Sequence, residues 1–197
     1  QDNVAVDYPA AIPNRFNIGM LHTSLDSEAG GEHARYAPCK VSDLVAKGYD
    51  YWALGHIHKR AVVHADPPIV FAGNIQGRHI RESGAKGCML VSVDARGRPG
   101  REFEPLDGFR WEHCELDAAG AEHGDEIVER LSAPLAALLK QHDGVPLAVR
   151  VSISGRCAAH RQLMADPDHW QSQIRAVATD VAAGNVWIER VRLQTEA

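Results

Sequence analysis

The stretch Tyr51-Trp52-Ala53-Leu54-Gly55-His56-Ile57-His58 predicts a short buried strand that ends in a glycine and two histidines. Four apolar residues in a row are typical of a strand buried on both faces, and the glycine allows a sharp turn at its end. His56 and His58 are two residues apart, so on extended backbone both imidazoles project to the same side. Imidazole nitrogens placed in this way bind Mn, Fe, Zn or Ni. The stretch therefore indicates a metal site, although incidental pairing in a chain with 11 histidines is the alternative.

A second strand is predicted to end at His22. Phe16, Ile18, Met20 and His22 alternate with the residues between them, which is the period of a strand. The polar segment 23–40, with Gly30 and Gly31, predicts a long loop after it, and His33 in this loop is a weaker candidate for the site. Two histidines at strand ends of one sheet are placed to converge on the same metal ions.

The third informative stretch is residues 71–82, which hold two glycines, two amides, two arginines and a histidine. Glycine exposes backbone N–H groups and arginine offers forked donors, so the stretch suits phosphate contacts. A polar hairpin loop is the alternative interpretation.

The remaining pattern predicts an α+β protein in two parts, with a boundary near 106–108. Short strands are expected near 61–64, 69–72, 88–93 and 101–105, with a helix from Ser42 to Lys47 that Ser42 caps. After residue 107 the pattern becomes strand, helix, strand, helix, strand. The expected elements there are strands at 109–117, 145–153 and 186–193, a helix within 125–142 that Pro134 kinks or splits, and a helix capped by Asp166.

Composition excludes several classes of protein. The formal net charge is -5, with nine basic and fourteen acidic residues in 107–197, so a general nucleic-acid binder is not indicated. Residues 59–101 hold eight basic against three acidic residues, which locates any polyanion surface there. No apolar run is long enough for a membrane span and no signal peptide is visible. The four scattered cysteines predict free thiols in a reducing cytoplasm.

Three segments together resemble the calcineurin-like metallophosphoesterases, and among these the SbcD-like DNA repair exonucleases. The segments are 18–23, 51–59 and 73–78, and the resemblance covers roughly residues 15–105. It implies that His22 and His56 bind one Mn²⁺ and His58 the other. It also implies a fold in which residues 1–106 are the C-terminal part of an α/β/β/α β-sandwich. Residues 107–197 would be a small α+β domain for capping and DNA contact, or for partner docking.

The resemblance further implies DNA as substrate, an SbcC-like ATPase as partner, two Mn²⁺ or similar divalent ions as cofactors, and a cytoplasmic location. A homodimer is left open. Two ions ~3.5–4 Å apart would clamp a phosphodiester. Within this expectation the candidate phosphate contacts are Lys59, Asn74, Arg78, His79 and Arg81.

The family's upstream motifs are absent from residues 1–21. Those motifs supply the remaining metal ligands and the residue that protonates the leaving group, so the catalytic residues are unknown. Three imidazoles cannot hold two ions that each take about five or six ligands. We therefore expect this chain to be the C-terminal piece of a longer protein, inactive alone. The alternatives are a phosphoesterase for a nucleotide, phospholipid or phosphoprotein, and a non-catalytic capping or partner-docking module.

Overall fold

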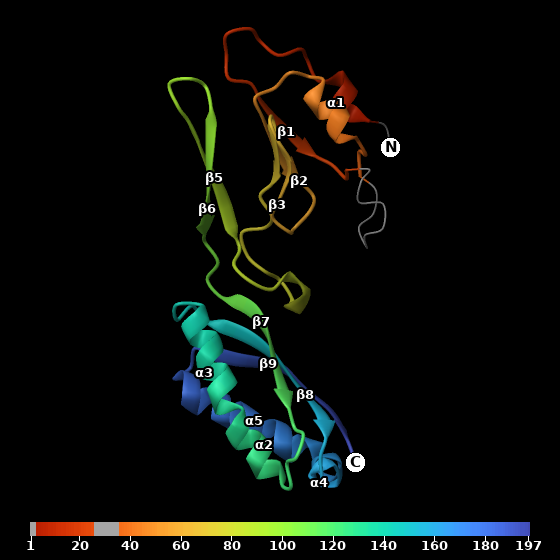
Figure 1. Cartoon of the computed structure of the whole chain (residues 1–197), viewed down its shortest axis with the longest axis vertical. Coiled ribbons are helices and arrows are strands. Elements are labelled where there is room, and N and C mark those ends of the chain that lie inside the picture. Colours follow the sequence, from red (N-terminus) through yellow and green to blue (C-terminus); the bar gives the residue numbers. More distant parts are fainter. Residues whose placement is uncertain (1–2, 26–35) are drawn as a thin grey trace. The chain divides into compact units, whose positions relative to one another are not determined.

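A computed structural model describes residues 3–25 and 36–197 and shows an α+β protein, as predicted (Figure 1). The chain forms two compact units. The first comprises Gln1–Ile75 and Lys86–Leu106, and the second comprises Gln76–Ala85 and Asp107–Ala197. The second unit thus includes a ten-residue segment that precedes the predicted boundary, and the chain passes between the units three times.

The first unit contains a four-stranded sheet with the order β1-β2-β4-β3. β1 pairs with β2 and β2 with β4 in parallel, whereas β3 and β4 are antiparallel. A separate antiparallel hairpin consists of β5 and β6. The strands span β1 Ile18–His22, β2 Tyr51–Gly55, β3 Ala61–Ala65, β4 Pro68–Phe71, β5 Gly87–Val93 and β6 Pro99–Pro105. All six predicted strands of this unit are confirmed.

The core of the first unit is built on Trp52, which is fully buried in β2. A Cβ atom added at Gly19 would lie 2.2 Å from the Trp52 ring, so only glycine allows the indole to lie across β1. Tyr49 stacks on the same indole, with ring centroids 4.9 Å apart. This packing places Gly19 and Leu21 inside, and leaves the apolar Ile18 and Met20 exposed.

The short helix α1 (Val41–Val45) confirms the predicted helix but not its predicted cap. The helix begins after Lys40 rather than at Ser42. The Asp43 carboxylate accepts hydrogen bonds from the Lys40 backbone N–H (2.9 Å) and from Asn3 Nδ2 (2.8 Å). These bonds, that from Lys40 first, lower the pKa of the Asp43 carboxyl. A carboxylate in the first turn thus holds the backbone N–H of the residue before the helix, in place of the predicted cap by Ser42. The 3₁₀ helix η1 (Val4–Asp7) packs beside it.

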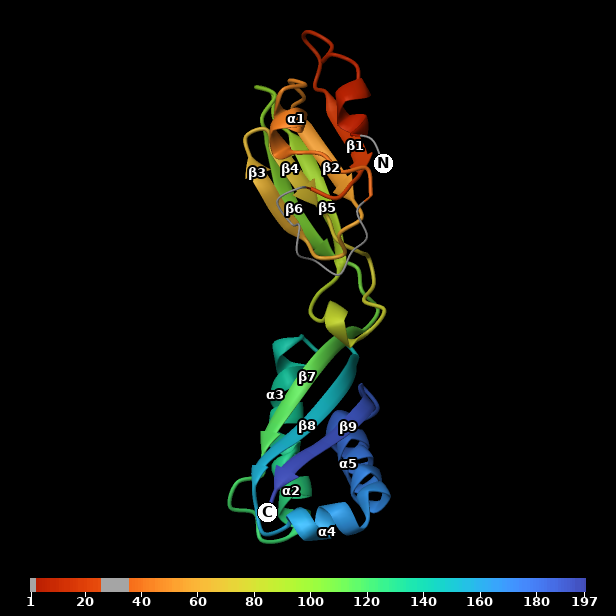
Figure 2. The same ribbon diagram turned by 90° about the vertical axis from the view of Figure 1, so that its right-hand side faces the viewer.

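The second unit is a three-stranded parallel sheet with the order β7-β8-β9 and helices on one face (Figure 2). The strand–helix–strand–helix–strand order is as predicted, although α4 was not expected. Its elements are η3 Ile80–Glu82, β7 Arg110–Asp117, α2 Gly124–Arg130, α3 Ser132–Gln141, β8 Leu147–Arg156, α4 His160–Ala165, α5 Pro167–Ala182 and β9 Val186–Glu196.

Two helix predictions for this unit are confirmed in detail. The helix within 125–142 is split at Leu131, and Pro134 occupies the first turn of α3, where its missing N–H has no partner to lose. The Asp166 side chain caps α5 by accepting the His169 N–H at 3.1 Å. Trp170 and Ile174 on α5 pack into the apolar core between the helices and one face of the sheet.

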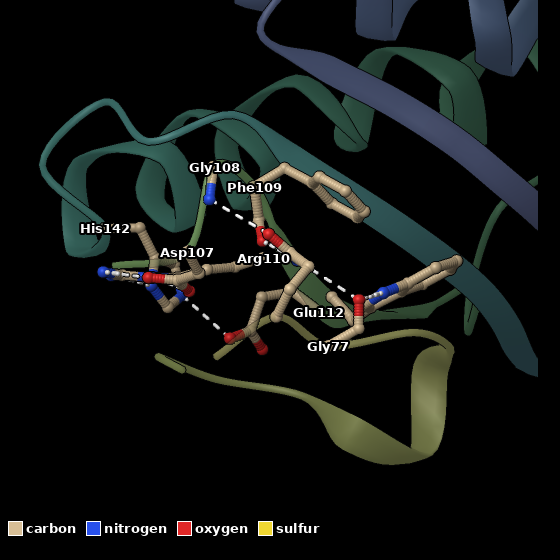
Figure 3. A network of polar contacts seen from close by, with 9 residues as sticks. Gly77, Asp107, Gly108, Phe109, Arg110, Glu112 and His142 are labelled. Atoms are coloured by element: carbon tan, nitrogen blue, oxygen red, sulfur yellow. Dashed lines mark hydrogen bonds and ion pairs between the residues drawn. The ribbon is translucent and has the colours of Figure 1, made fainter. Parts of the chain in front are cut away.

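A polar network holds the beginning of β7 in the second unit (Figure 3). Arg110 forms an ion pair at 2.9 Å with Asp107, whose side chain is almost fully buried. Arg110 Nη1 also lies 3.2 Å from His142 Nδ1, and His142 Nε2 lies 3.0 Å from Glu112 Oε1. Because a guanidinium only donates, Nδ1 accepts and the ring proton lies on Nε2, facing the Glu112 carboxylate.

Gln76 joins the segment 76–85 to this start of β7. Its Oε1 accepts the Gly108 N–H at 3.0 Å, and its Nε2 donates to the Phe109 carbonyl at 2.8 Å. The Trp111 indole N–H donates to the Gly77 carbonyl at 2.9 Å. These bonds give the ten-residue segment its place in the second unit.

The four cysteines are free, in agreement with the prediction of thiols. Burial raises the pKa of the Cys114 thiol to about 11, so this side chain is an inert packing residue at neutral pH. Among the described residues, no helix is long and apolar enough to cross a membrane.

Candidate metal and phosphate-binding residues

Two predicted ligands, His22 and His56, lie at the ends of neighbouring parallel strands. His22 is the last residue of β1 and is in register with Gly55, the last residue of β2. A Cβ atom at position 55 would lie 3.0 Å from His22 Nδ1, so the glycine makes room for the His22 imidazole. The centroids of the His22 and His56 rings are 5.2 Å apart, with an interplanar angle of 75°. The structure therefore brings these two imidazoles together.

The backbone at His56 is strained. Its φ of 101° is outside the ranges that side-chain-bearing residues commonly adopt. Strained residues of this kind gather at functional sites, where the surrounding structure holds them in place. The strain at His56 occurs where the chain leaves β2 and the imidazole meets that of His22.

Tyr36 contacts both imidazoles and was not among the predicted site residues. Its ring packs edge-on against His22 at 5.1 Å and stacks on His56 at 6.1 Å. Two hydrogen bonds with Ser24 fix its backbone, one from Ser24 N–H to the Tyr36 carbonyl (2.8 Å) and one from Tyr36 N–H to Ser24 Oγ (2.9 Å). The only sequence signal for Tyr36 is an aromatic residue in the polar stretch after a strand-end histidine. His33 lies outside the described residues.

The segment that holds His58 and Lys59 packs closely against Gly73. A Cβ atom at Gly73 would lie 2.9 Å from the His58 carbonyl oxygen and 3.1 Å from the Arg60 nitrogen. Position 73 also has a φ of 83°, so both the close contacts and the backbone conformation favour glycine over other residues. This packing places Asn74 one residue after the backbone contact with His58.

The predicted metal ligands and phosphate contacts divide between the two units. His22, His56, His58, Lys59 and Asn74 belong to the first unit, whereas Arg78, His79 and Arg81 belong to the second. The buried Glu82 carboxylate accepts the Arg78 backbone N–H at 2.8 Å and pairs with the Arg78 guanidinium at 3.3 Å. The Arg78 side chain is nevertheless 62% exposed, so its charge is available to solvent.

Comparison with known proteins identifies the relatives of this chain. Residues 111–196 match the family described as "Metallophosphoesterase YhaO, middle domain". Over 155 residues the chain is 38% identical to the "Uncharacterized metallophosphoesterase YhaO" of Bacillus subtilis (strain 168). That match covers 78% of this chain and 37% of the Bacillus protein.

The chain is a relative of the metallophosphoesterases. The part of the resemblance that named this superfamily is confirmed, whereas the SbcD-like branch remains a prediction. The match over residues 111–196 also shows that the second unit is similar to a known middle domain. Composition and periodicity did not indicate this similarity.

The imidazoles of His22 and His56 in this chain could form part of a metal site. Two imidazoles whose rings approach to 5.2 Å are suitable ligands for a divalent transition metal. Within residues 3–25 and 36–197, however, no three or more His, Cys, Asp or Glu side chains form a group that could hold an ion. In the described part of the chain, the carboxylates that Mn²⁺ prefers are therefore not gathered beside the imidazoles. The assignment of His22, His56 and His58 as ligands remains a prediction.

Proposed function

We propose that this chain is part of a two-metal-dependent phosphodiesterase that acts on DNA, of the exonuclease type found in double-strand-break repair. The observation that carries the proposal is the His22–His56 pair, held at 5.2 Å by the ends of two neighbouring parallel strands. It occurs in a chain related to metallophosphoesterases, with His-x-His directly after the strand. The Bacillus relative is much longer than the matched stretch, so the activity proposed is that of a whole protein.

The imidazoles of His22, His56 and His58 would hold the metal ions in the proposed enzyme. Bound divalent ions would supply Lewis-acid polarisation of the phosphodiester and offset the charge that grows on its oxygens. Other residues of the chain hold these imidazoles in position. Gly55 makes room for the His22 ring, and Tyr36 packs against both imidazoles and limits their rotation.

The choice of DNA as substrate is supported by exposed basic side chains that follow the predicted metal ligands in the sequence. Lys59, Arg78, His79 and Arg81 are exposed, and arginine binds phosphate oxygens through paired hydrogen bonds. Asn74 adds an amide to the same stretch of sequence. A cytoplasmic location and an SbcC-like ATPase partner are part of the same proposal.

The proposal is tested by hydrolysis assays on the longest natural reading frame that contains this chain, with Mn²⁺ present. Linear duplex DNA, a cyclic nucleotide and a phosphopeptide are offered separately, and DNA is expected to be the best substrate. His56→Ala should lower the rate at least about 100-fold, because a metal ligand is lost. His123→Ala, an exposed histidine directly before α2, is the matched control and should leave the rate unchanged.

Two results would contradict the proposal in different ways. Faster hydrolysis of the cyclic nucleotide or phosphopeptide would reject DNA as substrate and leave the metal site intact. Full DNA hydrolysis by His56→Ala would reject the metal site itself.

A further inference from the structure

The sheet of the second unit has one face without α-helices. Its α-helices all lie against the other face, as the view in Figure 2 shows. Parallel sheets are normally covered on both faces, because their strands are apolar on both sides. Here the open face carries aromatic and charged side chains instead, which are suited to a ligand.

Three aromatic side chains form a row at one end of this open face. Trp187 on β9 is 61% exposed, and its ring centroid lies 6.3 Å from that of Trp111 on β7. Phe109 is also exposed, with its ring 5.9 Å from Trp111. Ala148 lies between the two tryptophans in the strand register, and its small side chain lets the indoles meet across the central strand. The hydrogen bond from the Trp111 indole to Gly77 fixes the row.

Arginines continue the open face along β8 and β9. Arg150 forms a two-bonded ion pair with Glu189, with both distances 2.9 Å. On β9, Arg190 is in register with Arg150 and Arg192 with Ser152. Both arginines also lower the pKa of the Glu189 carboxyl, after the larger effect of Arg150. Arg190 and Arg192 are exposed, and the cluster carries an excess of positive charge. Two exposed carboxylates of this face, Glu115 and Asp117, lie on β7. A third, Glu196, lies at the end of β9 and pairs with Arg156 at 4.0 Å.

This combination selects one class of occupant. A protein helix or a second sheet laid on the face would bury Arg190 and Arg192 in an apolar contact, which is costly without paired carboxylates. A single nucleic-acid strand offers bases that stack on exposed aromatic rings and phosphates that pair with arginine. A duplex keeps its bases stacked on one another, so they are not available to stack on Trp187.

We propose that the second unit binds an unpaired nucleic-acid strand, with bases stacked on Trp187 and Phe109 and phosphates paired with Arg190 and Arg192. The proposal deepens the proposed function by naming a single-stranded segment as part of the substrate. It concerns residues of the second unit alone and needs neither metal nor hydrolysis.

The test measures binding of a fluorescent twelve-nucleotide oligothymidylate to the whole chain by anisotropy, without divalent metal. Trp187→Ala should weaken binding about 5- to 150-fold, the range for loss of one stacked base, whereas Trp187→Phe should retain most of it. Met164→Ala, an exposed apolar residue of α4, is the matched control and should bind as the original chain does. A duplex of the same length should bind more weakly than the single strand.

Salt dependence tests the arginines separately. Arg190→Ala and Arg192→Ala should each reduce the slope of log affinity against log salt by about 0.7, and Arg175→Ala on the helical face should not. Equal binding by Trp187→Ala would overturn the proposal. So would the absence of single-strand binding at low salt, or a loss of self-association in Trp187→Ala with no effect on the oligonucleotide, which would show that a protein covers this face. Because the assay lacks metal, its failure leaves the proposed hydrolysis untouched.

Discussion

The imidazoles of His22 and His56 meet with their ring centroids 5.2 Å apart, although 33 residues separate them in the chain. The contact follows from the parallel pairing of β1 and β2, which brings the ends of both strands to one edge of the sheet. Rings at this separation have room for one ion between their nitrogens, provided that each turns a nitrogen toward it.

We expect the isolated chain to bind Mn²⁺ weakly, and His22→Ala or His56→Ala to lower the affinity at least about tenfold. If both side chains hold one ion, the double variant should lose little more than either single variant, because the site is already broken. Titration calorimetry measures the three affinities, with His123→Ala as control. Additive losses from the two substitutions would show two independent sites.

Tyr36 provides a second prediction, because its ring contacts both imidazoles. Aromatic contacts of this kind are worth about 0.5–1.5 kcal/mol. Tyr36→Ala should therefore weaken Mn²⁺ binding about two- to tenfold by releasing the rings, whereas Tyr36→Phe keeps the contact and the affinity. If Tyr36→Phe were as weak as Tyr36→Ala, the hydroxyl rather than the ring would be the important group.

Gly19 provides a test of the packing that supports the site. Its substitution by alanine forces a Cβ atom to within 2.2 Å of the Trp52 ring, and should cost about 3 kcal/mol or more. Hydrogen exchange of the β2 amides should accelerate, while that of the β8 amides in the other unit should not. Met20→Ala, on the exposed side of the same strand, should change stability by less than about 0.5 kcal/mol.

The Arg150–Glu189 pair predicts a pH dependence of stability. The hydrogen bond and charge of Arg150 lower the pKa of the Glu189 carboxyl below its ordinary 4.5, so its contribution is present above that pH and is lost as pH falls through the lowered value. Glu189→Gln should cost about 1 kcal/mol at pH 7, and the difference should vanish in acid below the lowered pKa. Urea unfolding at several pH values measures it, with the exposed Glu129→Gln as control. A difference that persists unchanged into acid would contradict this origin.

Much of the fold follows from local patterns in the sequence. The buried run of β2, the alternation before His22 and the cap and proline at Asp166-Pro167 each specify one element, because burial periodicity and capping act over a few residues. The split of the helix at Pro134 follows in the same way, since proline is tolerated only in a first turn.

The features that local patterns do not specify come from contacts between distant segments. The exposure of Ile18 and Met20 depends on Trp52, which takes the space above Gly19 from another strand. The cap at Lys40 depends on Asn3, 40 residues from the Asp43 that it contacts. Tyr36 reaches the histidines only after Ser24 fixes its backbone, so neither its distance nor its orientation is visible in the sequence.

The hairpin β5–β6 begins and ends at almost one point, since the Leu106 N–H donates to the Lys86 carbonyl at 2.9 Å. The segment 76–85 before it and the segment 107–197 after it belong to the same unit. The hairpin thus interrupts the sequence of the second unit, but its own two ends stay close together. The length of the hairpin could therefore vary without moving these two ends, although residues 86–106 themselves belong to the first unit. A cut made at residue 107, by contrast, would remove the Gly77 carbonyl that receives the Trp111 indole proton.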